Sequence, residues 1–181
     1  MKKSLREEIA ELLRSFQNEF RGSVLHKSLE GEFSFLDDPS VGALSKFNLR
    51  IPMIHSKYLT FLIYLDEKIS EEERLYARAL ISRSILLRHG ATNRIDQAKL
   101  DSILENFTDI AVDVSQLKAN KNEIEELLKL YDPVLLTLEE SINSKKNRKT
   151  MIMNMLDQLN GYHWKISNHL QAKKFEAGIG G

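Results

Sequence analysis

Cysteine is absent from the 181-residue chain, and proline and glycine are scarce, at three and eight residues. The lack of cysteine excludes disulfides, thiolate metal sites and a cysteine nucleophile, and it fits a reducing compartment. With few prolines and glycines, few points force the backbone to turn, which favours long helices over a many-stranded sandwich. Long apolar runs are also lacking, because the most apolar stretch, Tyr58–Leu65, is far shorter than the roughly 20 residues that span a bilayer.

The formal net charge is zero, because 26 Lys and Arg residues balance 26 Asp and Glu residues. The protein therefore has no global positive field that would attract nucleic acid. The opening letters, MKKSLREEIAELL, lack the apolar core of a signal peptide, since charges interrupt every turn. We expect a soluble, cytoplasmic protein that needs no cofactor and does not enter the membrane.

Helical spacing of apolar residues is the strongest pattern that the sequence contains. Ser4 and Glu7 form a capping box, and apolar residues then recur every three or four positions as far as Phe20. Pro52 is suited to the first turn of a second helix, over 53–66. The N-terminal part of the chain is therefore predicted to be helical.

A third helix is predicted to begin at a second capping box, Ser70 with Glu73, and to end at Gly90. The segment 23–50 is the least regular part of the sequence. Its letters EFSFL alternate like those of a short strand, so a small hairpin or a loop packed on the helices is expected there.

Together these patterns predict an all-α, single-domain bundle of five to seven helices over residues 1–181. Residues 1–118 are expected to form a helical core that includes a fourth helix over about 95–118. Residues 119–181 are expected to form the C-terminal helices, in which a helical pattern runs with interruptions from Pro133 to Phe175.

An apolar seam runs along this C-terminal region. Its members recur at alternating steps of three and four residues, which is typical of a helix that packs against another helix. The candidate partner-binding residues are Ile152, Met155, Leu159, Tyr162, Ile166 and Leu170. Such a seam has to be covered by a helix of the same chain or of a second one.

Charge is segregated around the seam. Residues 101–144 carry 3 Lys or Arg against 10 Asp or Glu, a net charge of −7, and residues 145–181 carry 7 against 2, a net charge of +5. The candidate basic patch comprises Lys145, Lys146, Arg148, Lys149, Lys173 and Lys174. Its cations could lie in a solvated loop if the helix breaks near 143–144. They could instead pair with carboxylates, for which the acidic segment 101–144 of the same chain or of a second copy is the nearest candidate. In a further alternative, the first four of these cations, together with Trp164 and Tyr162, bind nucleic acid.

Catalytic and metal-binding motifs are not found in the sequence. There is no Glu-x-x-His or His-x-x-x-His step for a metal, and no glycine-rich loop that cradles phosphate. His163 and His169 are six residues apart, which places them on different faces of a helix. No metal site is therefore predicted.

One stretch resembles a known enzyme family. The letters RSILLRH, at Arg83–His89, resemble the arginine–histidine motif of HEPN-family ribonucleases, which are small and all-helical. The resemblance implies that Arg83 and His89 form a metal-independent RNA-cleaving pair at a dimer interface. Ser84 departs from the Asn, Asp or His that usually follows the arginine, and Arg21–His26 and Arg50–His55 match the spacing equally well.

These observations favour a non-catalytic helical interaction or adaptor subunit, either a component or an inhibitor of a larger assembly or a homodimer. The seam would supply the affinity for a protein partner, and the segregated charge would set its orientation. A nucleic-acid-binding subunit of a nucleoprotein complex is the first alternative, and a HEPN-like ribonuclease is the second.

Overall fold

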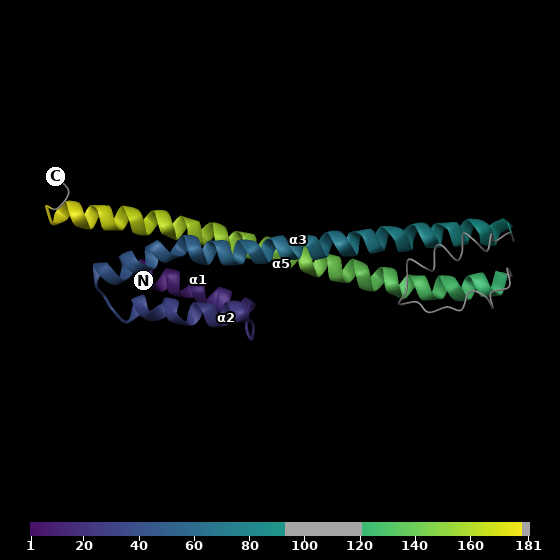
Figure 1. The fold of residues 1–181 in the computed structure, drawn as a ribbon, viewed down its shortest axis with the longest axis horizontal. Coiled ribbons are helices and arrows are strands. Elements are labelled where there is room, and N and C mark those ends of the chain that lie inside the picture. The colour runs from purple at the N-terminus through teal and green to yellow at the C-terminus, as the bar shows by residue number, and fades with distance from the viewer. Residues whose placement is uncertain (93–120, 179–181) are drawn as a thin grey trace. The chain divides into compact units, whose positions relative to one another are not determined.

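The computed structural model describes residues 1–92 and 121–178, except for the side chains of 85, 86, 88–92, 121–124 and 127. Every regular element in these ranges is helical, which confirms the all-α prediction (Figure 1). The elements are α1 (Leu5–Glu19), α2 (Val24–Leu29), the 3-10 helix η1 (Glu30–Leu36), α3 (Val41–Thr92) and α5 (Lys121–Glu176). The helix predicted over 95–118 lies outside the described residues.

Contacts within the chain group into two compact units. The first unit comprises Met1–Leu65 with Arg148–Gly181, and the second comprises Asp66–Asn147. Each of the helices α3 and α5 has one segment in the first unit and another segment in the second unit. The single-domain organisation stays a prediction.

Helix α1 begins as its capping box predicts. The Ser4 hydroxyl accepts a hydrogen bond from the Glu7 amide, and the Glu7 carboxylate accepts one from the Ser4 amide at 2.7 Å. After the helix, Gly22 has a φ of 82°, a left-handed conformation that glycine adopts without steric cost. The start of α1 therefore follows from its capping box, and the turn after its end follows from a glycine.

The hairpin expected in 23–50 is wrong, because this segment forms α2, η1, a short connection at 37–40 and the beginning of α3. In a 3-10 helix, residues three positions apart lie on the same side, so Phe33 and Leu36 face one way without forming a strand. Both of them pack against the core from η1, and Phe35 is buried beside Phe47 with ring centroids 4.3 Å apart. The alternating letters EFSFL thus reflect a tightly wound helical turn.

Helix α3 is continuous through both positions at which the sequence predicted a helix start. Proline inside a helix removes one backbone hydrogen bond and costs about 3 kcal/mol. Pro52 is nevertheless tolerated because Ile51 and Ile54, on either side of it, are buried in the core and hold the helix in place. The predicted start at Ser70 is also wrong, since α3 runs past it to Thr92.

Helix α5 is likewise continuous, from Lys121 to Glu176, and Pro133 lies inside it. Of the two alternatives for the cations that follow position 144, the solvated loop after a helix break near 143–144 is therefore wrong. None of the helices in the described ranges has a stretch both long and apolar enough to cross a bilayer.

The hydrophobic core of the first unit is built around aromatic rings from α1 and α3. Tyr58 lies 4.5 Å from Phe16 and 4.8 Å from Phe20, measured between ring centroids, and Phe20 also meets Phe61 edge-on at 4.9 Å. Burial raises the pKa of the Tyr58 hydroxyl well above its ordinary value. This cluster fixes α1 against the N-terminal half of α3.

In the second unit, the described parts of α3 and α5 pair in antiparallel fashion. Arg83 contacts Asp132, whereas Glu72, earlier in α3, contacts Lys145, later in α5. Tyr131 of α5 is buried in this unit. Burial raises the pKa of its hydroxyl, and a hydrogen bond with Ser82 partly offsets this rise.

Candidate interaction surface

The apolar seam predicted to bind a partner lies in the core of the first unit. Ile152, Met155, Leu159 and Ile166 are buried there, and Tyr162 and Leu170 pack against the same core. That core also contains residues of α1 and α3, such as Phe16 and Tyr58. The helices that cover the seam are therefore supplied by the chain itself, and little of the seam is accessible to a second chain.

Polar contacts fix the register of α5 on α3 in this unit. The Asn48 amide donates to the Ser167 hydroxyl at 3.0 Å, and that hydroxyl donates to the His163 carbonyl at 2.9 Å. Further along the two helices, the side chains of Asn160 and His55 are hydrogen-bonded at 3.2 Å. Each such contact is satisfied only when these residues are opposite one another, so it opposes sliding of the two helices.

Two cations of the basic patch pair with glutamates of α3 inside the second unit. The Lys145 ammonium donates to Glu72 at 2.6 Å and to the Ser141 hydroxyl at 2.7 Å, and Ser141 donates to the same Glu72 oxygen at 3.0 Å. Lys146 contacts Glu73 at 2.5 Å. These cations hold α5 on α3.

Arg148 plays a comparable part in the first unit. Its Nε donates to the Glu19 carboxylate of α1 at 2.5 Å. Its guanidinium also lies over two aromatic rings, with its central carbon 5.4 Å from the centroid of Phe20 and 5.0 Å from that of Phe61. Weakly hydrated and planar, an arginine suits such a partly buried position between a carboxylate and rings.

The carboxylates that these cations meet lie in 19–73, outside the acidic segment 101–144 from which a partner was expected. Of the remaining basic-patch residues, Lys173 contacts Glu176 of its own helix at 3.3 Å, and Lys149 and Lys174 also belong to α5. The patch is thus in large part an internal set of ion pairs.

The residues that resemble a ribonuclease pair are both in α3. Arg83 donates to the Asp132 carboxylate of α5 at 2.7 Å, which gives it a structural role in the second unit. His89 lies six residues further along, and its side chain is outside the described part of the structure. Within that part, no group of three or more His, Asp or Glu could hold a metal ion.

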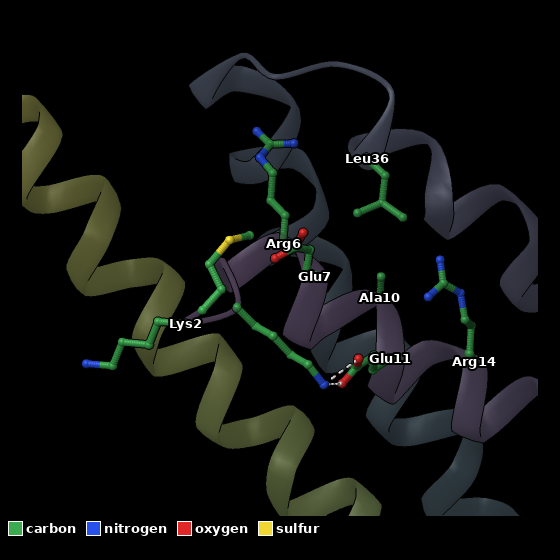
Figure 2. A pocket seen from close by; sticks show the side chains of 9 residues that line it. Lys2, Arg6, Glu7, Ala10, Glu11, Arg14 and Leu36 are labelled. Carbon is green, nitrogen blue, oxygen red and sulfur yellow. Dashed lines mark hydrogen bonds and ion pairs between the residues drawn. The ribbon is translucent and has the colours of Figure 1, made fainter.

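The first unit has a hollow of about 610 Å³ at the N-terminus of α1, shown in Figure 2. Arg6 and Arg14 of α1 and Leu36 of η1 help to line it. Arg6 donates hydrogen bonds to the backbone carbonyls of Phe35, Asp38 (2.8 Å) and Ser40 (2.9 Å), so its guanidinium is committed to the connection that precedes α3. Arg6 therefore has a structural role at the edge of this hollow.

A second hollow, of about 450 Å³, adjoins an ion pair between η1 and α3. Glu32 is only 4% exposed, and both of its carboxylate oxygens accept from Nε of Arg50 at 2.7 Å. A second guanidinium nitrogen also contacts Glu32. Because Arg50 supplies hydrogen bonds to both oxygens of the buried carboxylate, the ion pair links η1 to α3.

Helix α3 has an exposed apolar face in the first unit, which we call the outer face. At 100° per residue, Leu49 lies opposite the buried Tyr58, so the face points away from the core. Leu49 is 78% exposed, and the other large members are exposed as well. The outer face comprises Leu49, Pro52, Met53, Ser56, Leu59, Thr60, Ile63 and Tyr64.

The hydroxyls of Ser56 and Thr60 on the outer face are satisfied within the helix. Ser56 donates its hydroxyl hydrogen bond to the Pro52 carbonyl at 2.9 Å, and Thr60 donates to the Ser56 carbonyl at 2.9 Å. Burying a hydroxyl that keeps its hydrogen bond costs much less than burying an unpaired one. The face is thus suited to a dry contact.

The sequence contains a signal for this face. Within Tyr58–Leu65 every residue except Thr60 is apolar, whereas one core-facing stripe of a helix needs only about half of these positions. The surplus apolar residues, such as Leu59 and Ile63, are those that the structure places outside the core.

No protein-family model matches the chain, and neither a curated protein nor a solved structure shows significant similarity to it.

Proposed function

We propose that this chain is a non-catalytic helical interaction protein that binds a helix of a protein partner on the outer face of α3. One observation supports this most strongly: large apolar side chains such as Leu49 and Ile63 face water opposite a complete core. Contiguous exposed apolar surface on a soluble domain typically marks an interaction site. The amphipathic seam of α5, already buried, then serves to build the unit that presents the face.

The electrostatics of the outer face favour an apolar partner. Between Leu49 and Tyr64 the only Lys, Arg, Asp or Glu residues are Arg50 and Lys57. Arg50 is held by Glu32, so Lys57 is left at the border of the face. A helix packed in a groove contributes apolar residues at steps of three and four, which is the pattern that the outer face itself displays.

Binding of nucleic acid receives less support. Phosphate contacts require cations that are available to the ligand, and each one contributes to a steep dependence of affinity on salt. Lys145, Lys146 and Arg148 instead meet carboxylates of this chain. We therefore favour a protein partner.

Site-specific photo-cross-linking tests the proposal. A benzophenone side chain placed at Ile63 is expected to give cross-linked protein adducts in the cells that naturally make this chain, because the outer face is occupied there. The control is the same group at Leu136 of α5, which is 57% exposed against 56% for Ile63. Adducts at Ile63 should exceed those at Leu136 several-fold. Equal yields, or none at either position, would contradict the proposed function.

A further inference from the structure

We propose that the partner on the outer face is a second copy of this chain, packed antiparallel about a two-fold axis that passes close to Ser56. This inference rests on the proposed function and names its partner. Two-fold pairing is the commonest symmetry among soluble oligomers, and it requires a face that is complementary to itself. The order of residues along α3 meets that requirement.

The outer face is symmetric in sequence about Ser56. Leu49 precedes Ser56 by seven residues and Ile63 follows it by seven, while Met53 precedes it by three and Leu59 follows it by three. An antiparallel two-fold axis at Ser56 therefore places Leu49 of one copy opposite Ile63 of the other, and likewise Met53 opposite Leu59. Leu49, Met53, Leu59 and Ile63 thus each meet another of these four residues, and none of them meets a charge.

The centre of the face allows close approach. Helices pack with their axes 8–10 Å apart, and the smaller spacings need small side chains at the crossing point. Ser56 lies at the centre of symmetry and Thr60 lies one turn away, with both hydroxyls bonded to carbonyls of their own helix. The two backbones can therefore meet there without leaving a polar group unpaired.

The charges that flank the face along the helix select the antiparallel direction. Lys46 lies three residues before Leu49, and Glu67 lies three residues after Tyr64. Antiparallel pairing brings Lys46 of one copy toward Glu67 of the other, whereas parallel pairing brings like charges together. Surface ion pairs add little affinity, but opposed like charges disfavour the wrong orientation.

The size of the face predicts a weak dimer. From Leu49 to Tyr64 the helix extends about 22 Å, and the eight residues of the face are fewer than the roughly 20–30 residues that each partner contributes to a standard interface. Association in the micromolar range, with a clear dependence on concentration, is the expected behaviour.

Sedimentation velocity from about 1 to 500 μM tests the association. The full chain should shift from monomer toward dimer across this range. The double variant Leu49→Asp/Ile63→Asp places Asp opposite Asp across the contact, so it should weaken the dimer by about 30-fold or more, the loss typical of hot-spot residues, with an unchanged circular dichroism spectrum. Val24→Asp is the matched control, because Val24 is exposed at the start of α2 and away from the outer face. A monomer throughout the range would overturn the inference.

Disulfide trapping tests the geometry, and the natural absence of cysteine makes each introduced thiol unique. Ser56→Cys should form a dimer on mild oxidation. Mixing Leu49→Cys with Ile63→Cys should give the mixed disulfide, and neither variant alone should cross-link efficiently. Homodimers of Leu49→Cys alone would indicate parallel pairing and overturn the inference, as would the absence of any cross-link.

These outcomes are separable from those of the proposed function. Suppose that the chain stays monomeric and forms no trapped dimer, but that the benzophenone at position 63 gives adducts with another protein. That result refutes self-association and supports an interaction surface. Adducts whose mass equals two copies of the chain support both.

Discussion

Replacing Leu159 by alanine is expected to lower the free energy of unfolding by about 2–5 kcal/mol, the cost of removing a buried leucine and leaving a cavity. Leu159 has no exposed surface and belongs to the core that α1, α3 and α5 share in the first unit. Neighbouring backbone cannot easily close the cavity, because these helices are also held by polar contacts such as Asn48 with Ser167. Urea unfolding followed by circular dichroism measures the change.

Leu136→Ala provides the control for this prediction. Leu136 is a leucine of the same helix, but more than half of its surface is exposed. Its replacement should change the free energy of unfolding by no more than about 0.5 kcal/mol. A Leu159→Ala variant as stable as Leu136→Ala would show that the seam does not lie in the core.

Replacing Arg50 by methionine is expected to destabilise the protein by about 2 kcal/mol, because Glu32 is left buried without its cation. Loss of one member of a fully buried pair costs more, about 3–5 kcal/mol, but half of Arg50 is exposed and water can partly replace it. Thermal or urea unfolding gives the measurement. The variant should retain its helical circular dichroism at low temperature.

The double variant Arg50→Met/Glu32→Leu separates the lost ion pair from lost packing. Once the carboxylate is removed as well, no buried charge remains, and most of the stability should return. Equal destabilisation in the single and double variants would contradict this explanation, because it would assign the effect to the Arg50 side chain alone.

The helical class and the N-terminus of α1 could be predicted from sequence because both depend on local patterns. The capping box of Ser4 and Glu7 forms within four residues, and the structure shows both of its hydrogen bonds. The helix boundaries at Pro52 and Ser70 could not be predicted in this way, since packing of distant residues outweighs their local preference to start a helix. Similarly, the cations after position 143 stay helical because glutamates from distant positions neutralise them.

The candidate site was harder to predict because periodicity shows that a face is apolar but not what covers it. The seam through Leu159 and Ile166 has the spacing of a helix–helix contact, and that contact lies within the chain. The outer face of α3 could not be recognised from periodicity, because Tyr58–Leu65 is apolar on most sides of the helix. Core residues such as Leu62 are adjacent there to exposed ones such as Ile63. Deciding between them requires knowing which side of α3 the other helices occupy.

Thiol labelling of two single-cysteine variants tests most directly that the seam of α5 is internal and the outer face of α3 is external. In dilute solution, Leu49→Cys should react with a thiol reagent at nearly the rate of the unfolded chain. Leu159→Cys should react at least about 100-fold more slowly, since its thiol is exposed only when the unit opens. Equal rates for the two cysteines, or faster labelling at position 159, would contradict the assignment of these two faces.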